Sequence, residues 1–273
     1  MVISMKKIAA MILAGVMMVS LLAGCGTDGD NNNSGDTAKT TLTLGLDANF
    51  PPMGFKDENG DIVGFDIDLA KEVAKKMNVE LKLQSINWET KEIELKSGTI
   101  DVIWNGLTMT PSREEEMTFT KPYLKNKQVV AVLKDSSIQT FADMKDKTVV
   151  LQKGSTAVDA LKEDKNKSLA DSLKSTTELE QNMLCFTEVE LKRADAVIVD
   201  EVVAKYYLTK HPDKFRLLDE TLADEFYGIA VKKGNTQLRD QIQEALDELE
   251  KEGKTAEISK KWFSEDIYYS EAE

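Results

Sequence analysis

The chain has 273 residues, of which 41% are hydrophobic and 30% are charged, and its formal net charge at pH 7 is −13. Such an acidic balance disfavours nucleic acid and anionic membrane surfaces as partners, because both repel negative charge. The length allows one large domain or two modest domains.

Residues 1–24 are interpreted as a signal peptide. Lys6 and Lys7 give it a charged start, and the apolar run from Ile8 to Leu22 is too short to span a membrane comfortably. The run ends in Leu22-Ala23-Gly24-Cys25, which resembles a bacterial lipobox. The resemblance implies cleavage before Cys25 and attachment of lipid, including palmitate, to that residue. The alternative is an ordinary secretory signal with an incidental cysteine.

Residues 25–40 are expected to form a flexible tether, because residues 26–39 are mostly Gly, Asp, Asn, Ser and Thr with nothing large to bury. If Cys25 carries lipid, the second cysteine of the chain, Cys185, has no disulfide partner. Its neighbours Leu184 and Phe186 favour a buried, unreactive thiol.

The rest of the chain alternates between short apolar strands and amphipathic helices, which is typical of an α/β sheet with crossovers. A strand is predicted at Thr41–Leu46, followed by a turn that contains Pro51 and Pro52. Asp66 is predicted to be the N-cap of a helix that runs to about Met77. Because a helix N-terminus explains Asp66 physically, we assign this residue to the fold rather than to a site.

The same patterns predict further elements along the chain. They are strands at 80–85, 100–104, 128–133, 148–151, 196–199, 215–218 and 227–231, and helices at 89–96, from about 157, and at 201–208. Two closing helices follow, and their apolar stripes indicate core packing: Leu238, Ile242, Ala245, Leu246 and Leu249 on the first, Ile258 and Trp262 on the second.

The sequence shows no recognisable catalytic centre. His211, the one histidine, precedes Pro212 in a loop rich in Lys and Asp, where a solvated surface residue is expected. There is no metal-ligand spacing, no Gly-rich phosphate loop and no serine in a nucleophile elbow. We therefore expect no catalytic residue, metal or cofactor.

Polar side chains follow several of the predicted strands. Since ligands bind beyond the carboxyl ends of the strands in open α/β sheets, these positions are candidate ligand contacts. The candidates are Asp47, Phe50, Asn105, Gly106, Thr108, Arg113, Ser155, Thr156 and Asp200.

Arg113 and Asp200 give this set two poles. The planar guanidinium of arginine grips a carboxylate, and backbone N–H groups near Thr108 and Thr156 would assist it, the latter at a helix N-terminus. Asp200 would hold an ammonium group, so the set describes the two ends of a zwitterionic amino acid. Each residue alone also has a structural explanation: a surface ion pair for Arg113, an N-cap for Asp200, and a helix cap for Thr156.

Six segments carry a resemblance to a known family. The chain resembles the extracellular polar-amino-acid-binding proteins of ABC importers, in the type II periplasmic-binding-protein family (bacterial solute-binding protein family 3). The segments are residues 47–52, 64–69, 105–113, 119–123, 154–156 and 195–200; they run in family order, and the resemblance covers residues 42 to about 263, nearly all of the mature domain. The pattern departs at Asn105, where relatives often carry a small hydroxyl residue, and Trp88 and Trp104 are bulky for their places.

The resemblance implies an α/β fold of two lobes, each a mixed sheet flanked by helices, with a hinge of two crossing strands. Lobe one would comprise residues 41–128 and 229–273, and lobe two residues 129–228. The crossings would lie near 128–133 and 225–229.

The resemblance also implies a role for each candidate. Arg113 would bind an α-carboxylate with the backbone at Thr108 and Thr156, and Asp200 would bind an α-amino group with the Thr108 hydroxyl and the Gly106 carbonyl. The aromatic Phe50 would cover the ligand. Asp47 would face the ligand's side chain, which favours a basic or amide group there.

The implied function is the solute-binding component of an ABC transporter, which captures a polar amino acid between closing lobes and delivers it to a membrane permease. The protein would be a monomer, anchored through Cys25 to the extracellular face of a bacterial cell membrane, without nucleic acid as a partner. The alternatives are an enzyme on the same scaffold, such as a dehydratase, and a sensory ligand-binding domain.

Overall fold

The computed structural model describes residues 40–270. The predicted signal peptide, Cys25 and nearly all of the predicted tether lie outside these residues. None of the helices between residues 40 and 270 is long and apolar enough to cross a lipid bilayer.

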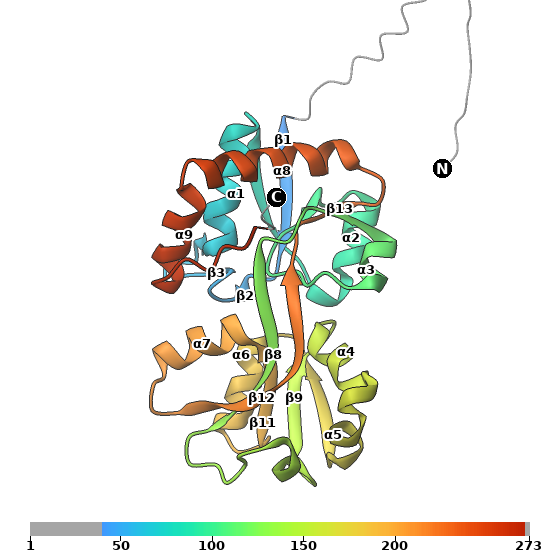
Figure 1. Ribbon diagram of the computed structural model, residues 1–273, viewed down its shortest axis with the longest axis vertical. Helices are drawn as coiled ribbons and strands as arrows, with labels where there is room; N and C mark the ends of the chain where they lie inside the picture. The colour runs from blue at the N-terminus through green and yellow to red at the C-terminus, as the bar shows by residue number, and fades with distance from the viewer. Residues whose placement is uncertain (1–39, 271–273) are drawn as a thin grey trace, which may run out of the picture. The chain divides into compact units, whose positions relative to one another are not determined.

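A first sheet of five strands is built from segments far apart in the chain. Its order is β5 (Glu80–Ser85), β1 (Thr41–Leu46), β6 (Val102–Ile103), β13 (Ala230–Lys232) and β7 (Met117–Phe119). β1 pairs in parallel with β5 and β6, whereas β13 is antiparallel to β6 and β7. Figure 1 shows helices on both sides of this sheet: α1 (Phe65–Lys76), α2 (Lys91–Ser97), α3 (Pro111–Glu116), α8 (Thr236–Lys251) and α9 (Lys254–Phe263).

A second sheet of five strands uses the middle of the chain. Its order is β10 (Ser175–Leu179), β9 (Thr148–Gln152), β11 (Ala196–Asp200), β8 (Leu124–Leu133) and β12 (Phe215–Tyr227). β9 is parallel to β10 and β11, and β8 is antiparallel to β11 and β12. Helices again flank the sheet: α4 (Thr156–Lys162), α5 (Lys167–Ser172), α6 (Asn182–Glu190) and α7 (Glu201–Lys210).

Smaller elements complete the fold. A three-stranded sheet contains β2 (Asn49–Phe50), β3 (Gly54–Lys56) and β4 (Ile62–Val63). Short 3₁₀ helices occur at η1 (Trp88–Thr90), η2 (Phe141–Met144) and η3 (Asp164–Asn166).

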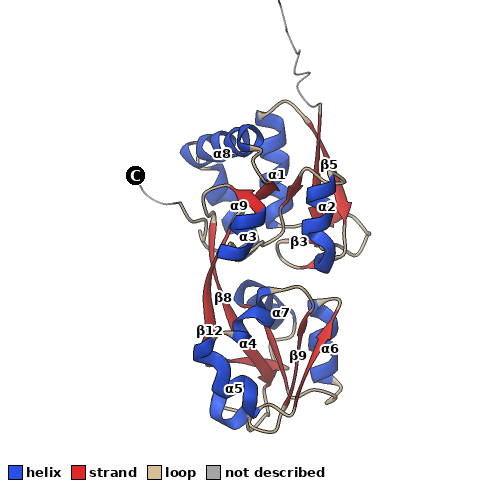
Figure 2. Cartoon of the chain, turned by 90° about the vertical axis from the view of Figure 1, so that its right-hand side faces the viewer, coloured by secondary structure: helices blue, strands red, loops and turns tan. Residues whose placement is uncertain are grey.

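We call the part of the chain around the first sheet lobe one and the part around the second sheet lobe two. The paired strands β8 and β12 run between the lobes in both views (Figures 1 and 2). This architecture confirms the expected α/β fold of two lobes with mixed sheets and a two-strand hinge. The lobe boundaries at 128/129 and 228/229 stay predictions.

The apolar stripes of the closing helices face the core, as predicted. On α8, Ile242, Leu246 and Leu249 are buried, and on α9 Ile258 is buried while Trp262 packs against the same cluster. Burial of such side chains supplies most of the stability of amphipathic helices.

Asp66 is not the N-cap of α1, and this prediction was wrong. The N-cap is Gly64, with φ 146°, a conformation that L side chains rarely adopt. A Cβ at Gly64 would lie 2.1 Å from the Met53 carbonyl oxygen, so the chain can begin the helix only with glycine here. Asp66 instead falls in the first turn, with its side chain fully buried.

Two strands also differ from the predictions. The strand predicted at 215–218 continues as β12 to Tyr227. The prediction stopped short because exposed acidic residues such as Asp219 and Asp224 interrupt the apolar pattern of the strand without ending the strand itself. The strand predicted at 227–231 is shorter, since β13 covers only Ala230–Lys232. The chain also contains β10 and α6, which the patterns did not indicate.

Cys185 is a free thiol on α6 and is fully buried, as predicted. Burial raises its pKa to about 12. The thiol is therefore protonated at neutral pH and unreactive in the folded protein.

Candidate functional site

The candidate residues come from both lobes, and hydrogen bonds between the lobes bring them together. Gln152, the last residue of β9, donates from Nε2 to Asp47 Oδ2 just after β1, at 2.6 Å. The hydroxyl oxygens of Thr108 and Thr156 lie 3.3 Å apart. The carboxyl ends of strands from both sheets therefore meet, which is the usual place for a ligand in α/β proteins.

Arg113 lies on α3, with its backbone N–H capped by the Thr110 hydroxyl. Its guanidinium donates from Nη1 to the Thr108 carbonyl at 2.9 Å and from Nη2 to the Gly154 carbonyl at 3.3 Å. The residue is only 9% exposed, and the carboxylate that pairs with it, Glu92, lies 3.7 Å from Nε. A surface ion pair therefore does not describe Arg113, which is a buried cation held by backbone carbonyls of both lobes.

Lys91 is a second buried cation beside Arg113, and it was not predicted from the sequence. The residue is 2% exposed, and its Nζ donates to the carbonyls of Trp88 and Gly154, each at 3.0 Å. Burial, followed by the charge of Arg113, lowers the pKa of Lys91 to about 8. A lysine in a Lys/Glu-rich helix is typical of a solvated surface, so the pattern gave no signal for this one.

Asp200 forms the acidic pole, at the end of β11. It occupies the N-cap position of α7, but its side chain makes no capping hydrogen bond. Its Oδ1 instead accepts from Asn126 Nδ2 at 2.7 Å and from the Tyr227 hydroxyl at 2.5 Å. Burial, with the charge of Glu225 second, raises the pKa of Asp200 to about 7. Helix capping therefore does not explain Asp200.

Glu225 joins the acidic pole from the hinge strand β12. Its Oε2 accepts from the Thr108 hydroxyl at 3.2 Å, Asn126 Nδ2 at 2.8 Å and Gln128 Nε2 at 3.1 Å. In the sequence, Glu225 was placed only at a predicted crossing and had no role. Glu225 and Tyr227 share a buried face of β12, but apolar and polar residues do not alternate over residues 223–227, so no sequence pattern indicated Glu225.

Asp47 and Asn105 lie together on the lobe-one side. The Asp47 N–H donates to Asn105 Oδ1 at 3.0 Å, and burial raises the pKa of the Asp47 carboxyl. Asn105 Nδ2 is buried and has no hydrogen-bond partner among residues 40–270. On the lobe-two side, Gln152 Oε1 accepts from Asn182 Nδ2 at 2.8 Å, which orients the amide that contacts Asp47.

Gly106 is held from below by Asp66. The Gly106 N–H donates to Asp66 Oδ2 at 2.7 Å, and the Tyr123 hydroxyl donates to the same oxygen at 3.0 Å. Burial raises the pKa of Asp66 to about 7. Asp66 thus fixes the backbone of a candidate residue without being one itself.

Phe50 forms an aromatic wall together with Trp88. Both side chains are buried, and their rings are nearly parallel, with an interplanar angle of 12° and a centroid separation of 6.5 Å. In the sequence, Trp88 was noted only because its side chain is bulky for its position. A planar group bound against such rings gains from stacking.

Ser155 and Thr156 begin α4, but neither caps it with its side chain. Ser155 is the N-cap residue, and its hydroxyl donates to the Gln152 carbonyl at 2.7 Å. The Thr156 hydroxyl faces Thr108 and accepts from Gln128 Nε2 at 3.3 Å. The helix-cap interpretation of Thr156 was therefore wrong, because its side chain points to lobe one rather than to its own helix.

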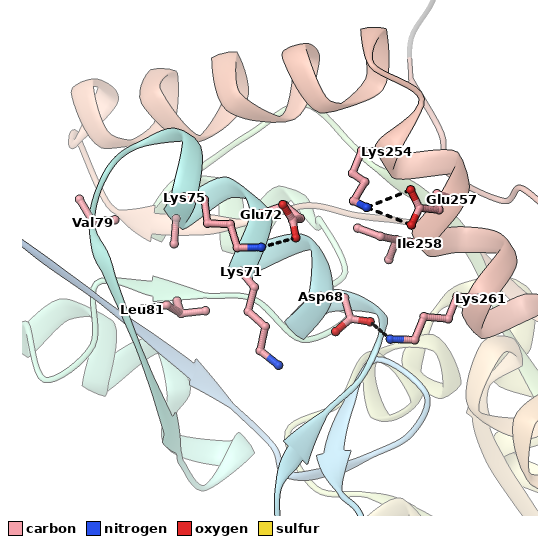
Figure 3. Close-up of a pocket in the computed structure, with 11 residues that line it drawn as sticks. Asp68, Lys71, Glu72, Lys75, Val79, Leu81, Lys254, Glu257, Ile258 and Lys261 are labelled. Carbon is pink, nitrogen blue, oxygen red and sulfur yellow. Dashed lines mark hydrogen bonds and ion pairs between the residues drawn. The ribbon is translucent and has the colours of Figure 1, made fainter.

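A charged groove elsewhere on lobe one contains none of the candidate residues. It lies between α1 and α9, and ion pairs satisfy much of its charge, for example Lys261 with Asp68 at 2.6 Å (Figure 3). Between residues 40 and 270 no group of His, Cys, Asp and Glu could hold a metal ion. His211 is half-buried at the end of α7, against the ring of Tyr207, and not fully solvated as expected.

Comparisons with known proteins agree with this geometry. Residues 42–265 match the model of the bacterial extracellular solute-binding proteins, family 3. The arginine-binding extracellular protein ArtP of Bacillus subtilis is 33% identical, over 95% of this chain and 99% of ArtP. A substrate-binding protein of an ABC uptake transporter from Streptococcus pneumoniae, solved with bound histidine, is 35% identical, with a TM-score of 0.81 over 85% of this chain and 95% of that one. The ancestral amino acid-binding protein AncCDT-1, a precursor of cyclohexadienyl dehydratase, is 33% identical, with a TM-score of 0.75 over 82% of this chain and 96% of that one.

Proposed function

Because the chain belongs to the bacterial extracellular solute-binding proteins of family 3, we propose that it captures a polar amino acid between its lobes and delivers it to the permease of an ABC importer. One observation carries the choice of ligand: a buried arginine of lobe one and a buried acidic pole lie near each other where the lobes meet. Opposite charges held apart in this way match the carboxylate and ammonium groups of a zwitterion.

Arg113 would bind the α-carboxylate, assisted by the backbone at Thr108 and Thr156. Its guanidinium now donates to the carbonyls of Thr108 and Gly154, so it is already oriented and a ligand carboxylate would use its remaining donors. Asp200, the Thr108 hydroxyl and the Gly106 carbonyl would bind the α-ammonium group.

The remaining candidates would line the space for the ligand's side chain. Phe50 with Trp88 would contact a planar group, while Asp47, Asn105 and Ser155 would supply polar contacts. Two relatives bind arginine or histidine, and both of these amino acids have a planar, basic side chain. We therefore propose a basic or amide amino acid as the ligand.

The mechanism would be closure of the lobes about β8 and β12. Ligand contacts come from both lobes, so an amino acid binds the closed form better than the open form and shifts the population towards it. The permease would then recognise the closed, loaded protein.

Cys25 would anchor the protein by lipid to the outer face of the cell membrane, with the Gly/Asn/Ser-rich tether giving the binding domain reach. Replacing Cys25 by Ser should move the protein from the membrane fraction to the medium. Retention of the C25S variant on membranes would contradict the anchor.

The ligand can be identified with a thermal-shift screen of the twenty amino acids, cystine and ornithine. A ligand at about 100 times its Kd stabilises the folded state by about 2.7 kcal/mol, so a true ligand gives a clear rise in Tm. Absence of any shift would contradict the proposed function.

Two variants test the poles by calorimetry with the amino acid found in the screen. Arg113→Ala and Asp200→Ala should each lower affinity about 30-fold or more, because a buried charged contact is worth about 2–5 kcal/mol. Arg193→Ala and Asp224→Ala, at side chains 64% and 82% exposed, are the matched controls and should bind like wild type. Wild-type affinity in either pole variant would refute the assignment.

An enzyme is the second candidate function, since AncCDT-1 shows that this scaffold can precede a dehydratase. The two proposals differ in turnover. Incubation of the protein with the bound amino acid, followed by NMR, should return the amino acid unchanged, whereas product formation would favour the enzyme.

A further inference from the structure

Two buried carboxylates meet at the hinge of this protein. Asn126 on β8 and Glu225 on β12 are direct partners in the register of the two hinge strands. Asn126 Nδ2 donates to Asp200 Oδ1 at 2.7 Å and to Glu225 Oε2 at 2.8 Å, so both acids are within hydrogen-bond distance of one nitrogen. The side-chain Oδ1 of Asn126 accepts from the Val202 N–H at 3.4 Å, which holds the side-chain amide in this orientation.

The groups in direct contact with the pair are neutral. β12 adds the Tyr227 hydroxyl, which donates to Asp200, and the Tyr123 ring centroid lies 6.5 Å from that of Tyr227. The neighbouring cation is Arg113, which attracts both carboxylates electrostatically while its guanidinium donates to the carbonyls of Thr108 and Gly154. The other direct contacts of the pair from β8 and lobe one are neutral donors.

A polar atom without a partner lies in the same cluster. Gln128 is fully buried, and its Nε2 donates to Glu225 and to Thr156. Its Oε1 has no hydrogen-bond partner among residues 40–270. Two carboxylates and an open carbonyl acceptor call for a cation with several N–H donors, since buried acceptors without partners are costly.

We propose that Glu225 is the second carboxylate of the ammonium site, and that a ligand α-ammonium enters in exchange for a proton held by Asp200 beside it. This inference rests on the proposed function and adds a residue and a proton to it. Before binding, Asp200 holds a proton in part of the molecules at neutral pH. On binding, that proton leaves to solvent, the ammonium group keeps its three hydrogens, and Asp200 becomes a carboxylate beside the positive ligand.

The sign of the pH dependence follows. In the free protein, burial first and the charge of Glu225 second raise the pKa of Asp200 to about 7. A bound ammonium favours the charged carboxylate, so binding lowers this pKa and releases the proton. Affinity should therefore rise with pH and level off above the free-state pKa. For a free-state pKa of about 7, it should fall about 50-fold between pH 7 and pH 5.

The test is calorimetry of the wild-type protein with L-arginine and L-glutamine between pH 5 and 7, where the α-ammonium group of both stays protonated. Each titration is run in two buffers of different ionisation enthalpy, which gives the number of protons released. We expect about 0.9 at pH 6 and about 0.5 at pH 7. Proton-neutral binding at pH 6 would overturn the inference while leaving the proposed function intact.

Variants test whether the released proton comes from Asp200 beside Glu225. Glu225→Gln removes the like charge that helps to raise the pKa of Asp200, so proton release at pH 6 should fall below the wild-type value while the ligand still binds. Asp224→Asn, on the same strand but exposed, should release protons like wild type. Unchanged release in E225Q, or loss of release in D224N, would overturn the assignment. If E225Q does not fold, the wild-type proton count still decides the exchange.

The two proposals fail in different ways. If no amino acid binds the wild type at pH 7, the proposed function fails and this inference fails with it. If an amino acid binds with a pH-independent affinity, the function stands and only the proton exchange is wrong.

Discussion

Replacing Gly154 by alanine should weaken ligand binding by obstructing closure of the lobes. Gly154 lies between β9 and α4 with φ 70°, and its carbonyl accepts from Lys91 and Arg113 of lobe one. A Cβ added here would lie 2.9 Å from the Glu89 Cα, which is backbone of the opposite lobe and cannot swing aside.

The free-energy cost of Gly154→Ala has two parts. A left-handed conformation costs a non-glycine residue about 1–2 kcal/mol, and this cost is present whether the lobes are open or closed, so it lowers the free energy of unfolding. The contact with Glu89 exists only when the lobes meet. Overpacking of this kind costs about 1–3 kcal/mol, which corresponds to a loss of affinity of about 5-fold to 150-fold.

Gly60→Ala is the matched control. Gly60 has φ 87°, and a Cβ there would meet nothing within 4 Å, so the variant carries the backbone cost alone. Urea denaturation should show similar destabilisation of both variants, while calorimetry with the amino acid from the screen should show weaker binding only for G154A. Equal affinities of the two variants would refute the reasoning.

Three further predictions concern single buried side chains. Burial raises the pKa of Asp66 to about 7 in the folded state, whereas the unfolded state releases this proton above about pH 4, so the free energy of unfolding should fall as pH rises from 5 to 8. D66N should flatten this slope in denaturant titrations, and an unchanged slope would contradict the burial argument. Cys185, with its pKa raised to about 12, should resist a thiol reagent in a Cys25→Ser background until denaturant is added, and rapid labelling of the native protein would contradict its burial. Trp88→Ala should lower affinity for a planar basic amino acid about 2-fold to 10-fold, the value of one lost stacking contact, whereas unchanged affinity would place the ligand's side chain elsewhere.

Residue type and position at strand ends were enough to choose two charged residues that lie buried where the lobes meet, and their roles as poles of a ligand site stay predictions. Arg113 and Asp200 were chosen as a cation and an anion after apolar strands, and both prove to be buried at the meeting point of the lobes. Strand ends collect in one place by topology, so local pattern carried this information.

The residues that sequence reasoning missed depend on long-range pairing. Glu225 and Asn126 are 99 residues apart and meet only through the register of β12 on β8. Lys91 is buried because its amine reaches the Gly154 carbonyl in the other lobe. No local pattern encodes these contacts, since each side chain alone reads as a surface residue.

Missed elements have a related explanation. β10 is an edge strand whose residues from Ser175 to Glu178 are all exposed, so it lacks the alternation that identifies a strand. In β12 a similar effect of exposed acids hid most of its length. Exposed residues of a strand are polar because they contact water, so their residue types do not indicate that the backbone forms a strand.

The position of β13 in the first sheet has a consequence for secretion. β13 sits between β6 and β7, although it follows them in the chain by more than a hundred residues, so those strands lack their shared partner until residue 232 is present. A chain exported from its N-terminus must therefore cross the membrane almost completely before lobe one can close its sheet. Until then it remains threadable, which translocation requires, but it exposes unpaired edges that favour aggregation.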